Sequence, residues 1–309
     1  MDNKMLVDTI LEIMYIVCGI VLIIGGIYSY TDKKNPKRIG SAVFWILFGI
    51  IFLAGPYMNK TVVGGILVFM GILTVTKNVK PGSLENSSVE KREKKAEELG
   101  NRLFIPALSI GVVAFGVAQF TKLGGLVGLG IGSLVAIILT MAVTKEHPKY
   151  VPYDSSRILH QMGPTVILPQ LLGALGAVFS AAGVGGVIAG FMGGIIPADS
   201  RLFGVIGYCI GMAVFTMIMG NAFAAFAVIT AGIGVPFVIN LGADPAMVGA
   251  LGLTAGYCGT LMTPMAANFN VVPASLLEMK NKNGVILAQF PVAIIMLVLH
   301  IIVMYFFAF

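Results

Sequence analysis

Charged residues are scarce in this chain. Only 11% of its 309 residues are Asp, Glu, Lys or Arg, against roughly 25% in an ordinary soluble domain. Hydrophobic residues make up 57%, and the mean hydropathy is +0.94. No water-soluble fold has enough polar surface to cover so much apolar mass, which excludes a soluble enzyme, a nucleic-acid-binding protein and a disordered chain.

The chain also lacks the usual signatures of catalysis. It contains no HExxH, no GxSxG and no phosphate-binding loop. Its 3 cysteines have no spacing typical of a disulfide framework or a metal site. We therefore expect no catalytic residues and no metal beyond a coupling Na⁺. An intramembrane enzyme is a distant alternative, because no nucleophile and base pair is visible.

Apolar stretches close to the length of about 20 residues that crosses a bilayer recur along the chain. The predicted crossings are residues 6–28, 39–54, 61–75, 103–120, 124–143, 158–181 and 285–307. The sequence thus predicts an all-α integral membrane protein with about eight transmembrane helices, one re-entrant hairpin and one broken helix. It also predicts scaffold helices in residues 1–157 and a transport module in residues 158–309.

Three segments of the second half do not fit simple crossings. Residues 183–197 are too short to cross comfortably and are expected near one surface, although a full crossing is the alternative. Residues 202–239 form two apolar arms, either a re-entrant hairpin or two full crossings. Residues 247–279 would span about 50 Å as one helix, whereas the hydrocarbon core is about 30 Å thick, so this helix is expected to break.

Lysine and arginine counts predict the orientation. With residues 202–239 as a hairpin, 16 of the 20 basic residues fall on one side, which should be cytoplasmic. Both termini are then outside a bacterial cell membrane. A full crossing at residues 183–197 changes the division to 15 against 5, so charge barely separates the two topologies.

One hydrophilic loop, residues 76–102, belongs to the predicted cytoplasmic side. Ser87 and Glu90 have the spacing of a capping box, and Gly100 is a suitable helix stop. The pattern predicts a solvated helix, with docking of a partner as the alternative.

The most informative stretch surrounds Pro264. Proline has no backbone N–H, so in a helix the carbonyl of Thr260 would lose its partner. Unwound backbone at membrane depth is tolerated only inside protein or beside a polar cavity. The same window contains Thr263, Asn268 and Asn270, whose neutral oxygens suit a small polar solute or a hard cation. The alternative is a proline kink with no ligand.

A second candidate site lies between the two apolar arms, where Asn221 stands far from any charge. If the arms form a hairpin, its tip carries Asn221 to membrane depth. If each arm crosses fully, Asn221 is a surface loop residue.

This order of elements resembles one repeat of the ion transporter superfamily, which includes sodium-coupled citrate and dicarboxylate carriers. More closely, residues 256–280 together with 220–236 resemble the domain of unknown function 979 family. That family is assigned as the larger membrane subunit of a two-component bacterial transporter of pyroglutamate (5-oxoproline). The closer resemblance covers essentially the whole chain.

In the superfamily, a hairpin tip and the broken-helix loop together hold a sodium ion and the substrate carboxylate. Carried over, the resemblance implies substrate binding and ion binding by two overlapping sets of residues. The substrate set is Asn221, Ala222, Thr263, Asn268 and Asn270, and the ion set is Asn221, Gly259, Thr260 and Thr263. Gly220 and Ala222 replace the hydroxyl residues of the superfamily tip, which leaves backbone amides to contact the carboxylate.

Only one unit of hairpin plus broken helix is present, whereas carriers of this type use two inverted repeats. The first five predicted crossings contain no second Thr-Pro break. The chain therefore resembles half of a transport unit, completed by a smaller membrane subunit or by a second copy. The expected function is cation-coupled import of a small carboxylate by Na⁺ or H⁺ symport; the alternative is a scaffold or regulatory membrane subunit that does not transport.

Overall fold

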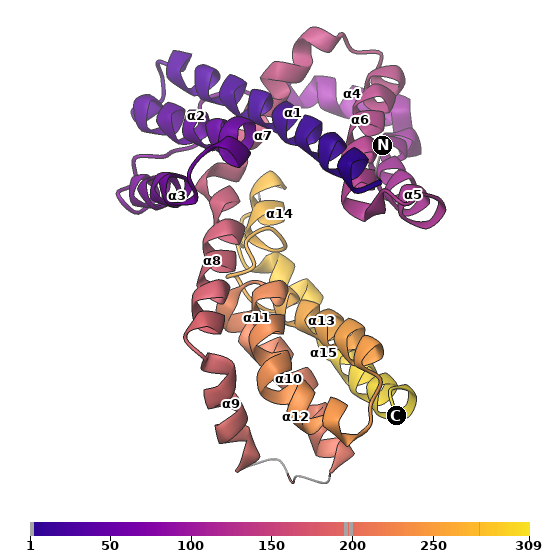
Figure 1. The fold of residues 1–309 in the computed structure, drawn as a ribbon. Helices are drawn as coiled ribbons and strands as arrows, with labels where there is room; N and C mark the ends of the chain where they lie inside the picture. Colours follow the sequence, from indigo (N-terminus) through magenta and orange to yellow (C-terminus); the bar gives the residue numbers. More distant parts are fainter. Residues whose placement is uncertain (1–2, 195–196, 198–199, 278) are drawn as a thin grey trace. The chain divides into compact units, whose positions relative to one another are not determined.

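The computed structural model describes residues 3–194, 197, 200–277 and 279–309, and these residues form helices and turns without any strand (Figure 1). Contacts divide the chain into unit 1, Met1–Gly163, and unit 2, Pro164–Phe309. Each unit is described separately below. The assignment of a scaffold role to one half and a transport role to the other stays a prediction.

Unit 1 consists of seven α-helices among its described residues. They are α1 (Asn3–Thr31), α2 (Arg38–Ala54), α3 (Lys60–Val75), α4 (Val89–Leu99), α5 (Phe104–Phe120), α6 (Gly124–Thr144) and α7 (Val151–Met162), with 3₁₀ turns at Gly55–Tyr57, Gly100–Leu103 and Pro148–Tyr150. Helix α1 packs along α2, and α5 packs along α6. Small residues allow this close approach: a Cβ on Gly19 of α1 would lie 2.9 Å from the carbonyl oxygen of Gly49 in α2.

Helix α4 confirms the solvated helix predicted in the hydrophilic loop, and it corrects the residue at its start. The N-cap is Ser88, whose hydroxyl accepts a hydrogen bond from the Lys91 amide at 3.3 Å, rather than Ser87. The helix stops at its C-cap Gly100 as predicted, and the positive φ of 49° there favours glycine. Both serines have cap-forming side chains, so spacing alone could not choose between them.

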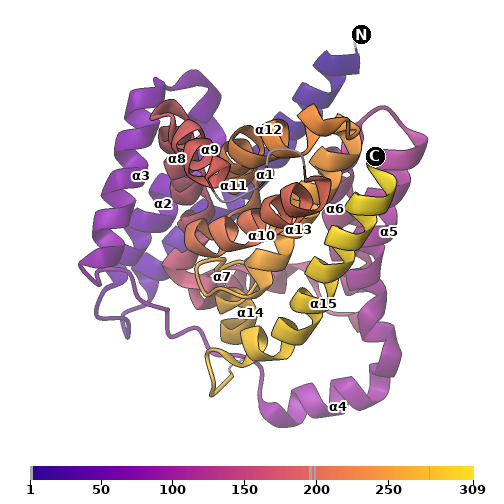
Figure 2. The same cartoon turned by 90° about the horizontal axis from the view of Figure 1, so that it is seen from below.

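Unit 2 contains a bundle around α10 (Arg201–Met219) and α13 (Pro245–Leu261), against which α11 (Ala222–Ile229) and α15 (Gly284–Phe307) pack (Figure 2). Its other elements are the 3₁₀ turn Gly163–Ile167 leading into α8 (Leu168–Ala181), α9 (Val184–Gly193), the π-helical turn Thr230–Gly234, α12 (Val235–Phe237), the 3₁₀ turn Ile239–Leu241 and α14 (Val271–Leu276). The core of the bundle includes Tyr208 and Met212 of α10, Val248 of α13 and Met304 of α15.

One predicted crossing is interrupted in the structure, and one predicted short segment is described only in part. The crossing expected at residues 158–181 is interrupted after Met162, where Gly163 takes a φ of 60° and Pro164 follows. A left-handed glycine followed by proline ends a helix for steric reasons. In the segment 183–197, α9 covers Val184–Gly193, and residues 195 and 196 lie outside the described residues.

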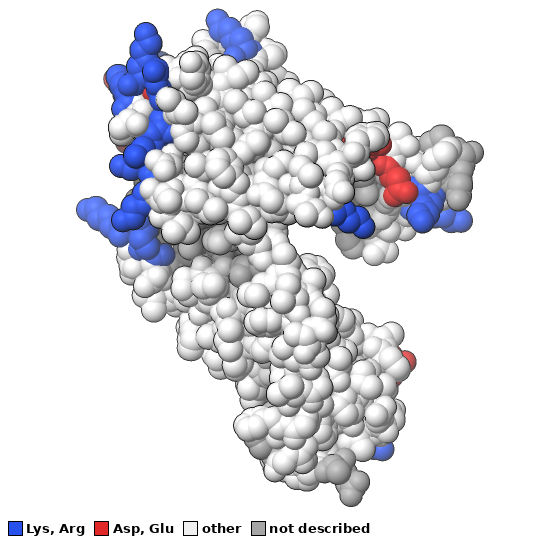
Figure 3. Space-filling view, turned by 60° about the vertical axis from the view of Figure 1, so that its left-hand side comes forward, with Lys and Arg blue, Asp and Glu red and all other residues white. Residues whose placement is uncertain are grey.

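Within the described part of the chain, eight helical stretches, some of which join consecutive helices and turns, are long and apolar enough to cross a membrane by length and composition. Their outward faces are apolar: Leu108 and Phe115 of α5 are 67% and 65% exposed. Figure 3 shows the same property as a face that is mostly free of charge, with many Lys and Arg side chains at its left-hand edge and a few others at the top and the right. A surface of this kind is stable only in contact with lipid or other apolar surfaces, so the chain is a multi-pass membrane protein of the all-α class.

Candidate substrate site

The helix predicted to break near Pro264 does break there. Helix α13 ends at Leu261, residues 262–270 run through turns, and α14 begins at Val271. The last turn of α13 is tightened by a hydrogen bond from the Met262 amide to the Gly259 carbonyl at 3.1 Å. Residue 278, inside the range predicted for this broken helix, lies outside the described residues.

The side chain of Asn270 closes the broken segment. Its Nδ2 group donates to the carbonyl oxygens of Thr260 at 2.8 Å and Thr263 at 2.7 Å, so it replaces backbone partners that the break removes. Asn270 is only 1% exposed. Its Oδ1 atom is buried without any hydrogen-bond partner among the described residues. A buried oxygen of this kind is available to a donor or a cation.

The turn between α10 and α11 positions Asn221. Helix α10 ends at Met219, its C-cap Gly220 has a φ of 70°, and Asn221 is the N-cap of α11. Its Oδ1 atom accepts hydrogen bonds from the amides of Phe223 at 2.9 Å and Ala224 at 3.3 Å. The cap therefore occupies the oxygen of this side chain and leaves its Nδ2 group, a donor, for a ligand.

The α10–α11 turn and the broken segment are in direct contact. A Cβ on Gly220 would lie 2.5 Å from the carbonyl oxygen of Met265, which leaves room for no larger residue. Thr263 also joins the broken segment to α10. Its hydroxyl donates to the carbonyl of Met217 in α10 at 2.9 Å and accepts from the Met265 amide at 3.2 Å. These contacts fix Asn221 beside the break.

A cavity of about 230 Å³ lies between these two segments. Four predicted residues line it: Asn221, Ala222, Thr260 and Asn268. Its other lining residues are Leu168, Pro169, Gly220, Phe223, Tyr257, Met265, Ala267 and Phe269. None of these lining side chains carries a formal charge, so recognition there depends on amide, hydroxyl and aromatic groups.

The remaining predicted residues form the supporting structure around the cavity. Gly259, Thr263 and Asn270 do not line it. Gly259 packs so closely on the Ala213 backbone that a Cβ would overlap it. Thr260 does line the cavity, but its hydroxyl already donates to the Tyr257 carbonyl at 2.6 Å. Contact of any of these residues with a substrate or ion stays a prediction.

Sequence reasoning missed the aromatic wall of this cavity. The ring of Tyr257 lies 6.0 Å from that of Phe223 and 6.1 Å from that of Phe269, measured between centroids. All three residues flank the polar positions that were predicted, but aromatic residues are common throughout membrane helices. Only their convergence from three separate segments distinguishes them.

A family model described as a protein of unknown function (DUF979) matches residues 12–309. The chain belongs to the DUF979 family. Neither a curated protein nor a solved structure matches it. The match covers nearly the whole chain of this DUF979 member, including the break after α13 and the α10–α11 turn, but the family description carries no activity.

Proposed function

We propose that this DUF979 protein is one subunit of a secondary active transporter that imports a small carboxylate, with 5-oxoproline as the substrate to test first. The observation that carries the proposal is the uncharged cavity between the α10–α11 turn and the broken end of α13. Discontinuous helices that expose backbone groups to a cavity are a recurrent feature of secondary transporters.

The donors at this cavity suit a carboxylate. The Oδ1 atom of Asn221 is bonded to the first amides of α11, so the side chain offers its Nδ2 group. Ala222, the first residue of α11, lines the same cavity, and a helix N-terminus attracts negative charge. Asn268 adds a second side-chain amide. In a site without cations, N–H groups of this kind are the means of holding an anion.

The aromatic wall suits the rest of the proposed substrate. 5-Oxoproline is a five-membered lactam, with an apolar ring, one amide and one carboxylate. The rings of Tyr257, Phe223 and Phe269 offer faces and edges against which such a ring packs. A pocket that combines apolar walls with a few convergent polar groups is typical of small-molecule sites.

Neutral oxygens near the cavity favour Na⁺ over H⁺ as the coupling ion. No Asp or Glu lines the cavity to carry a proton. The unpartnered Oδ1 atom of Asn270 is a suitable ligand for a hard cation, and it lies on the side chain that already binds the carbonyls of Thr260 and Thr263. A partner subunit that contributes a carboxylate would reverse this preference.

The site is proposed to be half of a complete one. Among the described residues, the α10–α11 turn and the broken segment after α13 meet at one cavity, whereas inverted-repeat carriers use two such units. We assign the second half to a smaller membrane subunit, with a second copy of this chain as the alternative. The transporter works in the bacterial cell membrane with both termini outside.

Uptake of labelled 5-oxoproline into proteoliposomes tests the proposal. Vesicles should contain this chain with its partner subunit and be assayed with and without an inward Na⁺ gradient. Asn221→Ser is the sharpest variant, because serine keeps the helix cap but removes the Nδ2 donor. We expect it to abolish uptake, whereas Asn59→Ser, a change of the same kind at the N-cap of α3, should leave uptake unchanged.

Normal uptake by Asn221→Ser would remove this residue from the site. Absence of 5-oxoproline uptake by the intact wild-type complex, with other small carboxylates also excluded, would favour a scaffold or regulatory subunit. Uptake that follows a pH gradient and ignores Na⁺ would assign the coupling to protons.

A further inference from the structure

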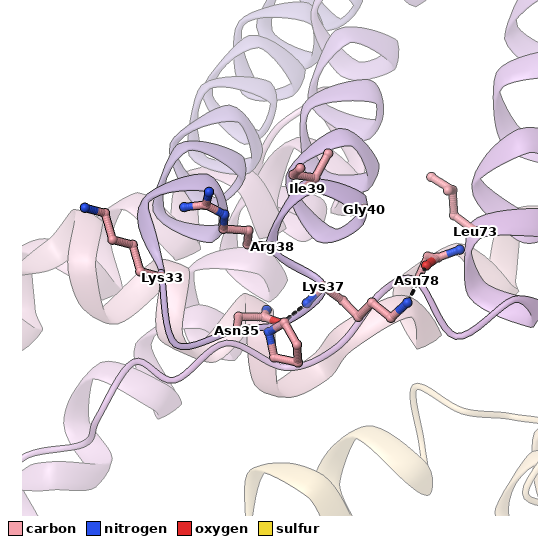
Figure 4. Close-up of a pocket in the computed structure, with 9 residues that line it drawn as sticks. Lys33, Asn35, Lys37, Arg38, Ile39, Gly40, Leu73 and Asn78 are labelled. Carbon is pink, nitrogen blue, oxygen red and sulfur yellow. Dashed lines mark hydrogen bonds between the residues drawn. The ribbon is translucent and has the colours of Figure 1, made fainter.

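A basic pocket lies in unit 1, where α1 ends, α2 begins and α3 ends. Its volume is about 660 Å³. The residues that line it are Lys33, Asn35, Pro36, Lys37, Arg38, Ile39, Gly40, Leu73 and Asn78. Figure 4 shows Lys37 directed toward Asn78, while Lys33 and Arg38 extend on the other side of the loop. None of these residues lines the cavity beside Asn221.

The three cations of this pocket have no carboxylate partner among the described residues. The ion pairs of the described residues involve four other cations, which do not line this pocket: Lys34, Lys91, Lys95 and Arg157. The Nζ atom of Lys37 donates to Asn78 Oδ1 at 3.0 Å, and the Arg38 guanidinium lies 5.7 Å from the centre of the Tyr30 ring. The positive charge is therefore not neutralised.

The nearest acidic residue in the sequence is turned away to other partners. Asp32 accepts hydrogen bonds from the Ser83 amide at 2.6 Å and the Ser83 hydroxyl at 2.5 Å. It also accepts from the Lys34 amide at 3.2 Å. These bonds direct the carboxylate toward the segment after α3 and leave the cations of the pocket to an external anion.

The backbone at the start of α2 also favours an anion. Helix α2 begins at Arg38, and its N-cap Lys37 makes no side-chain cap hydrogen bond. The first turn of a helix without a side-chain cap presents N–H groups and the positive end of the helix dipole. Ile39 and Gly40 of this first turn line the pocket beside the cationic side chains.

Apolar residues decide which kind of anion fits. Ile39 is 62% exposed, and Leu73 lines the pocket from the end of α3. The pocket thus lies where apolar helices end, which is the level of lipid headgroups. A phosphate that carries acyl chains satisfies both the cations and these apolar side chains, whereas inorganic phosphate satisfies only the cations.

We propose that this pocket binds the phosphate group of an anionic phospholipid. Clusters of Lys and Arg at the membrane boundary attract anionic lipids electrostatically. Lys33 and Arg38 contact the headgroup, the first turn of α2 faces the phosphate, and the acyl chains pass along Ile39 and Leu73. The bound lipid joins the ends of α1, α2 and α3 at the surface.

Native mass spectrometry of the full chain in detergent tests this proposal with phosphatidylglycerol and phosphatidylcholine as probes. The double variant Lys33→Gln/Arg38→Gln removes two cations of the pocket. Arg92→Gln/Lys94→Gln, on the exposed helix α4, is the matched control with the same change of net charge. Lys33→Gln alone changes no residue of α2. It therefore keeps the test valid if the double variant, which alters the start of α2, fails to fold.

We expect the wild-type chain to bind phosphatidylglycerol at least about tenfold more tightly than phosphatidylcholine. The pocket variant should lose this preference, Lys33→Gln should lose part of it, and the α4 control should keep it. Millimolar inorganic phosphate should not displace the lipid. Equal binding of both lipids, equal loss in the control, or displacement by phosphate alone would each overturn the proposal.

Discussion

The Nδ2 atom of Asn270 lies 2.8 Å from the carbonyl oxygen of Thr260. This bond spans the unwound segment after α13 and holds its two ends together. The break is therefore an ordered part of the fold whose freed backbone groups have partners, and it does not depend on a ligand to exist. The order of this segment allows a cavity of defined lining to form next to the α10–α11 turn.

Asn270→Ala should destabilise unit 2 through the carbonyls that it leaves unpaired. Two buried acceptors, on Thr260 and Thr263, lose their donor, and each unsatisfied group costs about 1–3 kcal/mol. Thermal unfolding followed by circular dichroism in detergent measures the loss. Asn268→Ala, an exposed residue of the same loop, should change stability by less than about 0.5 kcal/mol. Equal effects of the two variants would contradict the closure role of Asn270.

Gly220→Ala should be destabilising for two reasons. The φ of 70° is unfavourable for alanine by about 1 kcal/mol or more, and the new Cβ would press on the Met265 carbonyl. Gly173→Ala in α8 is the matched control, because nothing lies within 4 Å of its Cβ position. The control should be neutral or slightly stabilising, given the helix propensity of alanine. The same unfolding assay checks both, and a harmless Gly220→Ala would mean that the turn does not pack on the loop.

Asn221 variants should separate capping from ligand binding. Asn221→Ala removes the acceptor of the Phe223 and Ala224 amides and should cost about 1 kcal/mol of stability. Asn221→Ser keeps an acceptor and should cost much less. Uptake should be lost in both variants if the Nδ2 donor contacts substrate. Wild-type uptake by Asn221→Ser, with a loss of stability only in Asn221→Ala, would restrict Asn221 to its capping role.

Asp32 should make the attachment of the segment after α3 dependent on pH. Burial alone would raise the pKa of Asp32, but hydrogen bonds from Ser83 and the Lys34 amide outweigh it and lower the pKa below 3.8. Because the folded pKa is lowered, the stabilisation is fully present above the ordinary carboxyl pKa and disappears as pH falls through the folded value.

Hydrogen exchange at the Ser83 amide measures this effect. The ratio of protection in the wild type to that in Asp32→Asn should be high at neutral pH and should approach one as the carboxyl protonates. A ratio that does not change with pH would show that the Asp32 charge plays no part in holding Ser83.

The sequence predicted much of the fold because apolar runs and helix breakers act locally. The ends of α2, α5 and α6 lie within one residue of their predicted positions. The break near Pro264 also followed from local chemistry, since proline removes a donor wherever it stands. The interruption at Gly163 was missed because a single glycine and proline can also occur within a kinked helix.

The candidate site could be predicted only in part. Asn221, Thr260 and Asn268 were selected as polar residues in apolar surroundings, and the structure brings them to one cavity with Ala222. The supporting roles of Thr263 and Asn270 were not visible, because their hydrogen bonds reach carbonyls on other segments. The partners of Lys37 and Asp32, Asn78 and Ser83, were likewise hidden, because each lies more than 40 residues away in the chain.

By itself, the amino-acid sequence determined that this is a helical membrane protein with a break at Pro264, because hydropathy and the missing proline N–H act over one or two helical turns. Only the tertiary structure decided which polar groups form hydrogen bonds within the protein and which face a cavity. Hydrogen bonds and packing between distant segments make that choice, and the order of residues along the chain does not encode their distances directly.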